Sequence, residues 1–258
     1  MKFLRDTWLV YSRAMKLNIK QPVWLIVMLV QPLYFLVFFA PLLNSFDEVP
    51  GGAMPGFENG AMETFVPGLI IMMALFGSTF VGFGLIAELR QGVIERMRVT
   101  PVSRVALLIG RTLSTVTTTI VQALILIVLA SPIGGLTIYW PGVFLMLGII
   151  VLTSFMLGAL SYGVALVLKS EDSLAPTLNT LVQPVMLLSG IMLPMAMAPS
   201  WLQNVADFNP FYYAVQAARE LFAGNLDSDF VWQAAAILGV LAVLLVAWAS
   251  RKFARAVA

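Results

Sequence analysis

The chain has 258 residues, of which 60% are hydrophobic and only 11% are charged, and its formal net charge is +2. A soluble domain usually carries about 25% charged residues, so this composition is typical of a protein whose surface largely faces lipid. The sequence contains neither Cys nor His, which excludes disulfides, thiolate ligands and Cys- or His-based catalysis, and so argues against an enzyme.

The first segment, residues 3–20, predicts an amphipathic helix. At 100° per residue its apolar side chains share one face, and its basic side chains lie opposite. The apolar face holds Leu4, Trp8, Tyr11, Met15 and Ile19, and the basic face holds Arg5, Arg13, Lys16 and Lys20. This pattern is typical of a helix that lies in the membrane interface, here spanning about 1–22. Two interpretations stay open: a membrane anchor only, or an anchor whose polar face also meets a cytoplasmic partner.

Six apolar runs are long enough to cross a bilayer as helices, which takes roughly 20 residues. They are continuous rather than alternating, which favours helices over barrel strands. The runs cover about 23–43, 64–87, 105–131, 142–168, 174–198 and 231–250. Three prolines, Pro176, Pro184 and Pro194, interrupt the fifth run.

The basic residues fall almost entirely on one side of this topology. All of them except Arg219 lie in the N-terminal segment, in the loops after the second and fourth runs, at the inner edge of the third run, or in the tail. Basic segments stay in the cytoplasm, so both ends of the chain are predicted to be cytoplasmic in a multi-pass protein of the cell (inner) membrane. An even number of spans predicts the same.

The loop after the second run predicts a short helix over 88–98. Leu89, Val93 and Met97 recur every four residues, and Thr100 and Pro101 are typical of the start of the next helix. This segment is either a solvated basic loop or a docking surface for another protein. The loop over 46–63 is rich in Gly and Pro and is expected to be irregular and exposed.

The segment before the last run predicts two short helices that dip into the outer leaflet. Proline and asparagine residues punctuate it, and Trp201, Leu202 and Val205 lie at helical spacing before a second stretch, Phe211 to Phe222. In isolation Arg219 is expected to be a surface residue whose charge reaches water. The functional alternative is a gate on the exit side.

The runs lack the groups that other membrane machines need. Their cores hold almost no ionisable side chains, which argues against an ion-driven carrier, and no polar pore pattern is evident. The hydroxyl run Ser114–Thr119 is interpreted as helix-packing contacts. No Lys follows a Gly, so the chain has no phosphate-binding loop, and ATP would have to be bound by a separate subunit that contacts 88–98.

Two blocks of sequence then carry a family resemblance. The first is Glu88–Arg111, containing Glu-Arg-Met-Arg-Val-Thr-Pro-Val-Ser-Arg, and the second joins Leu187–Pro194, Pro199–Leu202, Asn209-Pro210 and Arg219. With them, nearly the whole chain resembles the membrane subunit of type-2 ATP-binding-cassette exporters of the daunorubicin-resistance permease type. The resemblance implies one all-α integral membrane domain over 1–258. Six transmembrane helices would be joined by the interface helix, a cytoplasmic coupling helix and short outer re-entrant helices.

The resemblance also implies three groups of site residues, with no catalytic and no metal site among them. The ATPase-coupling group is Glu88, Gln91, Gly92, Glu95, Arg96, Arg98, Pro101 and Arg104. The second cytoplasmic contact is Lys169, Glu171 and Asp172, and the outer gate is Pro194, Trp201, Asn209, Pro210 and Arg219.

The function that the resemblance implies is a permease subunit that moves a hydrophobic or amphiphilic small molecule, such as a drug, antibiotic or lipid-like compound, out of the cell. The chain itself would hold no cofactor, because ATP and Mg would be bound by two copies of a cytoplasmic ATPase. A second permease, identical or related, would complete the assembly in the lipid membrane, without nucleic acid. The alternatives are export of polysaccharide or lipid-linked glycan, and a non-transporting membrane scaffold.

Overall fold

All regular elements in the described part of the chain are helices, which confirms the all-α prediction. The computed structural model describes residues 2–20, 22–47, 56–57, 60–90, 104–134 and 138–256. The elements are α1 (Lys2–Lys20), α2 (Pro22–Asp47), α3 (Ala61–Thr79), α4 (Gly82–Arg90), α6 (Arg104–Gly134), α7 (Trp140–Leu168), α8 (Glu171–Leu187), η1 (Met195–Met197), α9 (Ser200–Ala206), α10 (Pro210–Phe222) and α11 (Asp229–Ala256).

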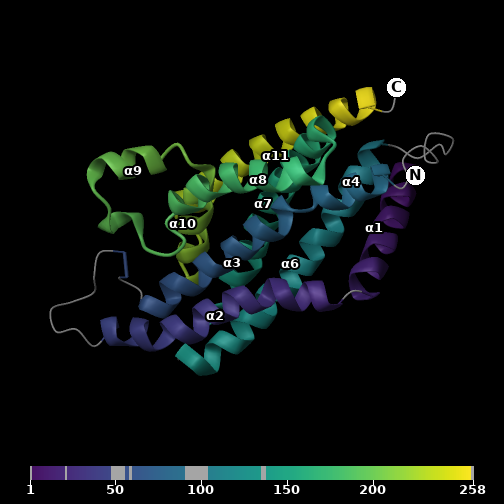
Figure 1. Cartoon of the computed structure of the whole chain (residues 1–258). Helices are drawn as coiled ribbons and strands as arrows, with labels where there is room; N and C mark the ends of the chain where they lie inside the picture. Colours follow the sequence, from purple (N-terminus) through teal and green to yellow (C-terminus); the bar gives the residue numbers. More distant parts are fainter. Residues whose placement is uncertain are drawn as a thin grey trace.

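The helices form an elongated bundle with two distinct ends. Figure 1 places α1, the end of α4 and both labelled chain ends at one end, here called the α1 end, and the short helix α9 at the other, here called the α9 end. The long helices run between these two ends. The basic helix α1 and the ends of α4 and α11, which also carry basic residues, therefore lie at the same end of the molecule.

Five helices in the described ranges are long and apolar enough to cross a membrane. They are Leu25–Leu43, Ala61–Ala87, Val105–Pro132, Trp140–Leu168 and Asp229–Phe253. These five agree with the first, second, third, fourth and sixth predicted runs to within a few residues. The chain is therefore a multi-pass membrane protein.

The fifth predicted run ends earlier than expected. Its helix, α8, stops at Leu187 rather than at 198, and its 17 residues rise only about 26 Å, short of the roughly 30 Å hydrocarbon core. The chain turns at Ser189 and Gly190, where φ is +75° and a side chain would be strained. Hydropathy alone did not mark this turn, because the residues after it are again apolar.

Helix α3 is the centre of the bundle. Leu69, Ile70, Ile71 and Leu75 have no exposed surface, whereas only 17% of the apolar span in α2 and in α11 is buried. The second crossing breaks between α3 and α4, and the backbone N–H of Gly82 donates to Ser161 Oγ of α7 at 2.9 Å. The break therefore lies against α7 rather than against lipid.

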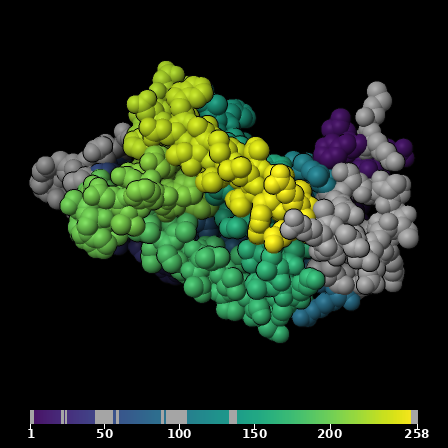
Figure 2. Space-filling model, turned by 90° about the horizontal axis from the view of Figure 1, so that it is seen from above, coloured from purple at the N-terminus to yellow at the C-terminus, as the bar shows by residue number. Residues whose placement is uncertain are grey.

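Helix α7 packs closely on its neighbours through glycines. A Cβ at Gly142 would lie 1.7 Å from the carbonyl oxygen of Leu221 in α10, and one at Gly163 would lie 1.7 Å from the Trp248 ring of α11. Small residues let membrane helices approach in this way. Figure 2 shows α11 crossing one face of the molecule, with α9 and α10 beside its beginning.

The N-terminal segment forms the predicted helix, α1, and it packs against α6. Thr7 is buried, and a Cβ at Gly110 of α6 would meet the Thr7 carbonyl oxygen at 2.8 Å. The Tyr11 hydroxyl lies 3.3 Å from Thr117 Oγ1, whose hydroxyl otherwise donates to Leu113 within α6. Most hydroxyls of the Ser114–Thr119 run likewise bond inside their own helix rather than across to another.

Candidate functional site

Arg219 is the centre of a buried contact at the α9 end. Its side chain is only 7% exposed, although it was expected at the surface, so that expectation is wrong. Its Nε donates to the carbonyl oxygen of Thr64 in α3 at 3.0 Å, and its Nη2 donates to that of Gly190 at 2.7 Å. One guanidinium thus joins α10, α3 and the turn that ends α8. We call this contact the Arg219 brace.

The hydrogen bonds of the Arg219 brace explain how the protein can bury the charge of this residue. The guanidinium of an arginine stays protonated in proteins, so Arg219 is a buried positive charge. A buried charge is costly unless it is hydrogen-bonded, and backbone carbonyl oxygens supply that bonding here. The planar fork of Arg suits two acceptors in different segments.

Asn209 makes a second tie beside the brace. Its Oδ1 accepts from the backbone N–H of Phe211 at 3.0 Å and so caps α10, while its Nδ2 donates to the carbonyl oxygen of Val185 in α8 at 2.7 Å. Pro210 occupies the first turn of α10, where its missing N–H is not needed. The predicted dipeptide Asn209-Pro210 therefore starts α10 and fixes it to α8.

Replacing Asn209 with Asp separates these two roles. The carboxylate still caps α10 but cannot donate to Val185, so we expect a loss of about 1–3 kcal/mol of stability. The fall in melting temperature of the detergent-purified protein measures it. The control is Gln203→Glu, the same chemical change at a half-exposed residue whose amide donates to Ala198 at 2.9 Å. Equal shifts in the two variants would contradict the role given to Asn209.

The remaining predicted gate residues lie around this contact without joining it directly. A Cβ at Gly56 would come 2.3 Å from that of Pro194, so the loop before α3 packs on the turn after α8. Phe57 in that loop is 4% exposed, which corrects the expectation of a fully exposed loop. Trp201 on α9 is 65% exposed and points away from the core.

At the α1 end, the second predicted contact lies beside the end of α4. Arg90 Nη1 and Glu171 Oε1 are 3.7 Å apart, and their side chains are 56% and 38% exposed, so the pair adds little stability. Lys169 ends α7 in a left-handed conformation with φ of 52°, and its N–H donates to Ala165 at 2.9 Å. This tight reversal places Glu171 and Asp172 next to the start of the predicted coupling segment.

Most of the predicted coupling group lies outside the described residues. This applies to Gln91, Gly92, Glu95, Arg96, Arg98 and Pro101. Glu88 lies in α4 and Arg104 begins α6, but their side chains are outside the description. The coupling role of this group therefore stays a prediction.

Sequence reasoning missed a polar stripe on α8. Asn179, Thr180 and Gln183 are exposed, whereas Leu174 and Leu178 on the opposite face are buried. Pro184 has no N–H, so the Thr180 carbonyl oxygen on the same face lacks its helical donor. Exposed amides are unfavourable against hydrocarbon, so this face suits a protein or aqueous neighbour. The spacing of Asn179 and Gln183 was the available signal.

Most of the chain matches a known protein family and known relatives. Residues 5–223 match the family described as ABC-2 type transporter. The chain is 26% identical over 244 residues to the daunorubicin resistance ABC transporter permease protein DrrB1 of Streptomyces coeruleorubidus, covering 92% of this chain and 81% of that protein. It is 26% identical over 231 residues to the probable doxorubicin resistance ABC transporter permease protein DrrC of Mycobacterium tuberculosis, covering 86% and 79%. It is also 26% identical over 229 residues to the putative transport permease ycf38 of Cyanophora paradoxa, covering 86% and 75%.

Proposed function

Because the chain belongs to the ABC-2 type transporter family, we propose that it is the membrane-spanning permease of an exporter driven by a separate ATPase. The match over residues 5–223 carries this proposal. The substrate class follows from the relatives named for daunorubicin and doxorubicin resistance, and we propose a hydrophobic or amphiphilic small molecule. ATP and Mg belong to the partner, since the chain has no phosphate-binding loop.

The α1 end faces the cytoplasm in this proposal. The basic residues of α1 and of the ends of α4 and α11 lie there, and basic segments stay cytoplasmic. The α9 end then faces outward. The turn after α8, with α9 and α10, completes a sixth crossing and returns into the outer leaflet.

The polar stripe on α8 would line the path between two permease copies. A second copy, identical or related, would shield Asn179, Thr180 and Gln183 from lipid and enclose a passage. Neutral amides in that passage would hydrogen-bond to hydroxyl and carbonyl groups of the cargo, while its apolar part meets the neighbouring helices. Such a stripe also suits a glycan, which keeps polysaccharide export as the second candidate.

Movement of the partner ATPases would displace helices at the α1 end, and these helices would transmit the displacement to the Arg219 brace at the α9 end. The predicted coupling segment 88–98 begins in α4, which packs against α7, and α7 reverses into α8 at Lys169. A pull on α4 would therefore act through α7 on α8, and α8 is fixed at its other end by Asn209 and by the turn at Gly190. Outward opening would require these ties to loosen or move as one unit.

Reversing the two charges at the centre of the coupling segment tests this route. In the double variant Glu95→Arg with Arg96→Glu, we expect export to be abolished, because the docking surface for the ATPase is reversed. Membrane level and melting temperature should stay as in the wild type. Export is measured as drug efflux from cells that produce the chain with its ATPase, and ATPase co-purification is measured in parallel.

One outcome would contradict only the coupling role of Glu95 and Arg96, and another would contradict the exporter function itself. Unchanged export by the double variant would remove the coupling role of Glu95 and Arg96 but leave the exporter function intact. If the wild-type chain, extracted gently from its native membrane, brought no nucleotide-binding protein with it, the scaffold alternative would replace the exporter.

A further inference from the structure

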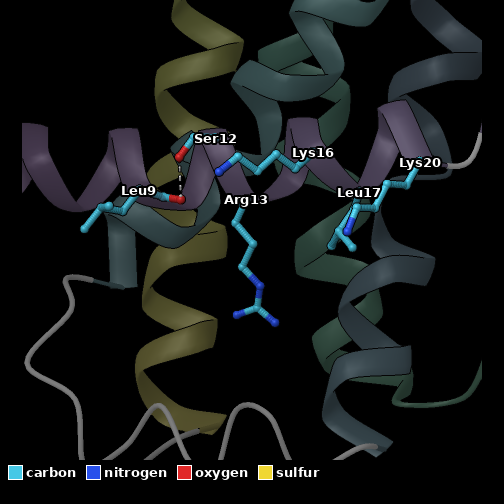
Figure 3. A pocket seen from close by; sticks show the side chains of 6 residues that line it. All are labelled: Leu9, Ser12, Arg13, Lys16, Leu17 and Lys20. Atoms are coloured by element: carbon cyan, nitrogen blue, oxygen red, sulfur yellow. Dashed lines mark hydrogen bonds between the residues drawn. The ribbon is translucent and has the colours of Figure 1, made fainter.

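The exposed side of α1 carries a hollow that the proposed transport function does not use. It has a volume of about 400 Å³ and is lined by Leu9, Ser12, Arg13, Lys16, Leu17 and Lys20. Figure 3 shows the six side chains along one helix: Arg13 reaches away from it, Lys16 runs along it toward Ser12, and Lys20 lies beside Leu17, with Leu9 at the other end. All six lining residues belong to α1, so the hollow is an open depression on the surface of one helix.

The three cations of this hollow are exposed and open to a ligand. Arg13, Lys16 and Lys20 are all exposed, and no carboxylate within the described ranges lies at ion-pair distance from them. Like charges at such spacing on a helix repel one another. An anion bound between them would relieve this repulsion, and phosphate oxygens are strong acceptors for both Arg and Lys.

The position of α1 places these cations at the depth of lipid headgroups. α1 ends at Lys20, α2 begins at Pro22, and the apolar span begins at Leu25. The three residues from Pro22 to Leu25 rise about 4.5 Å along a helix, while the headgroup layer is roughly 5–7 Å thick on each side. In a bilayer whose hydrocarbon core begins at Leu25, Lys20 and Lys16 would lie at the depth of the lipid phosphates.

Apolar side chains on the same helix complete an amphiphilic surface. Leu9 and Leu17 in the hollow are about half exposed, and Leu4, Trp8 and Ile19 are exposed on the adjoining face. Trp8 packs against Tyr11 with ring centroids 5.2 Å apart, an aromatic pair of the kind enriched at the membrane interface. A ligand that meets both surfaces needs an anionic group joined to hydrocarbon.

We propose that this hollow binds the phosphate headgroup of an anionic phospholipid, with Arg13, Lys16 and Lys20 holding the phosphate and Leu9 and Leu17 contacting the adjoining glycerol and acyl carbons. A basic cluster on an interfacial helix is suited to this class of lipid. An acidic protein surface would also meet the charges, but the headgroup depth and the leucines inside the hollow favour the lipid. The proposed site uses none of the residues of the predicted outer gate or of the predicted coupling group.

The test uses the complex of the chain with its ATPase, purified in detergent and mixed with equal amounts of phosphatidylglycerol and phosphatidylcholine. Native mass spectrometry counts the lipids that stay bound, and we expect phosphatidylglycerol to be preferred. In the variant Arg13→Gln, Lys16→Gln, Lys20→Gln, the preference should fall roughly tenfold or more, because each basic residue near an anionic surface contributes about a fivefold factor. The control Arg251→Gln, Lys252→Gln, Arg255→Gln removes the same charge from the end of α11, outside α1, and should keep the preference.

A conservative variant guards against loss by misfolding. Lys16→Arg with Lys20→Arg keeps the charge and should keep the preference for phosphatidylglycerol. Retention of the preference by the triple glutamine variant, or an equal fall in the control, would overturn the proposal. Displacement of the lipid by excess inorganic phosphate would assign the site to a free anion, and loss of the ATPase with lipid binding unchanged would assign it to a protein partner. Either result would also overturn it.

Discussion

Replacing Gly142 of α7 with Ala is expected to destabilise the protein strongly, because the added methyl group would collide with the backbone of α10. The new Cβ would lie 1.7 Å from the Leu221 carbonyl oxygen and 2.7 Å from its carbon. Backbone atoms cannot rotate away as a side chain can, so α7 and α10 must move apart. Overpacking of this kind costs about 1–3 kcal/mol, and more where the neighbour is rigid.

The matched control lies on the same helix. At Gly148 a Cβ would meet nothing within 4 Å, so Gly148→Ala should be neutral or slightly stabilising, since Ala favours the helix by about 1 kcal/mol over Gly. Melting temperatures of the two variants in one detergent measure the difference. Equal melting temperatures would show that α7 and α10 do not pack as closely as the glycine contact requires. Because α10 carries Arg219, the Gly142 variant should also lose export.

Replacing Arg219 with Met is expected to abolish export and lower the melting temperature. The substitution keeps an apolar stem but removes the donors to Thr64 and Gly190, and hydrogen bonds from charged groups contribute about 1.5–3 kcal/mol each. The turn after α8 would then lose its tie to α3. Arg219→Lys should recover little of either property, because one ammonium lacks the fork that reaches both oxygens.

The neighbouring residue supplies the control for the Arg219 brace. Glu220 points outward and accepts from Asn225 Nδ2 at 2.8 Å, an exposed contact. Glu220→Gln should keep wild-type export and stability. Full export by Arg219→Met would refute the brace as part of the outer gate. A lowered melting temperature with normal export would leave it a structural contact only.

The sequence predicts correctly those helices whose position depends only on residues that are neighbours along the chain. Apolar length predicted five of the spans, and the Asn209-Pro210 cap predicted the start of α10, because both depend on residues that are neighbours along the chain. The early end of α8 was missed because Ser189 and Gly190 interrupt a run that stays apolar on both sides. The coupling residues between 91 and 103 remain predictions.

Arg219 was misplaced for a different reason. Its two acceptors are backbone carbonyl oxygens, 155 and 29 residues away along the chain. Every residue has a carbonyl oxygen, so no residue type marks these as partners. The polar stripe on α8 was missed although its spacing was visible, because that segment was judged by its mean hydropathy rather than by the face on which its amides lie.

The order of the brace along the chain has a consequence for biosynthesis. Both acceptors, Thr64 and Gly190, precede Arg219, so a ribosome producing the chain from its N-terminus has already delivered them when the arginine emerges. The most deeply buried cation of the described residues therefore never has to wait in the membrane for a later segment to arrive. The reverse order would leave a charge without acceptors during insertion, at the stage when a nascent membrane protein is most exposed to quality control.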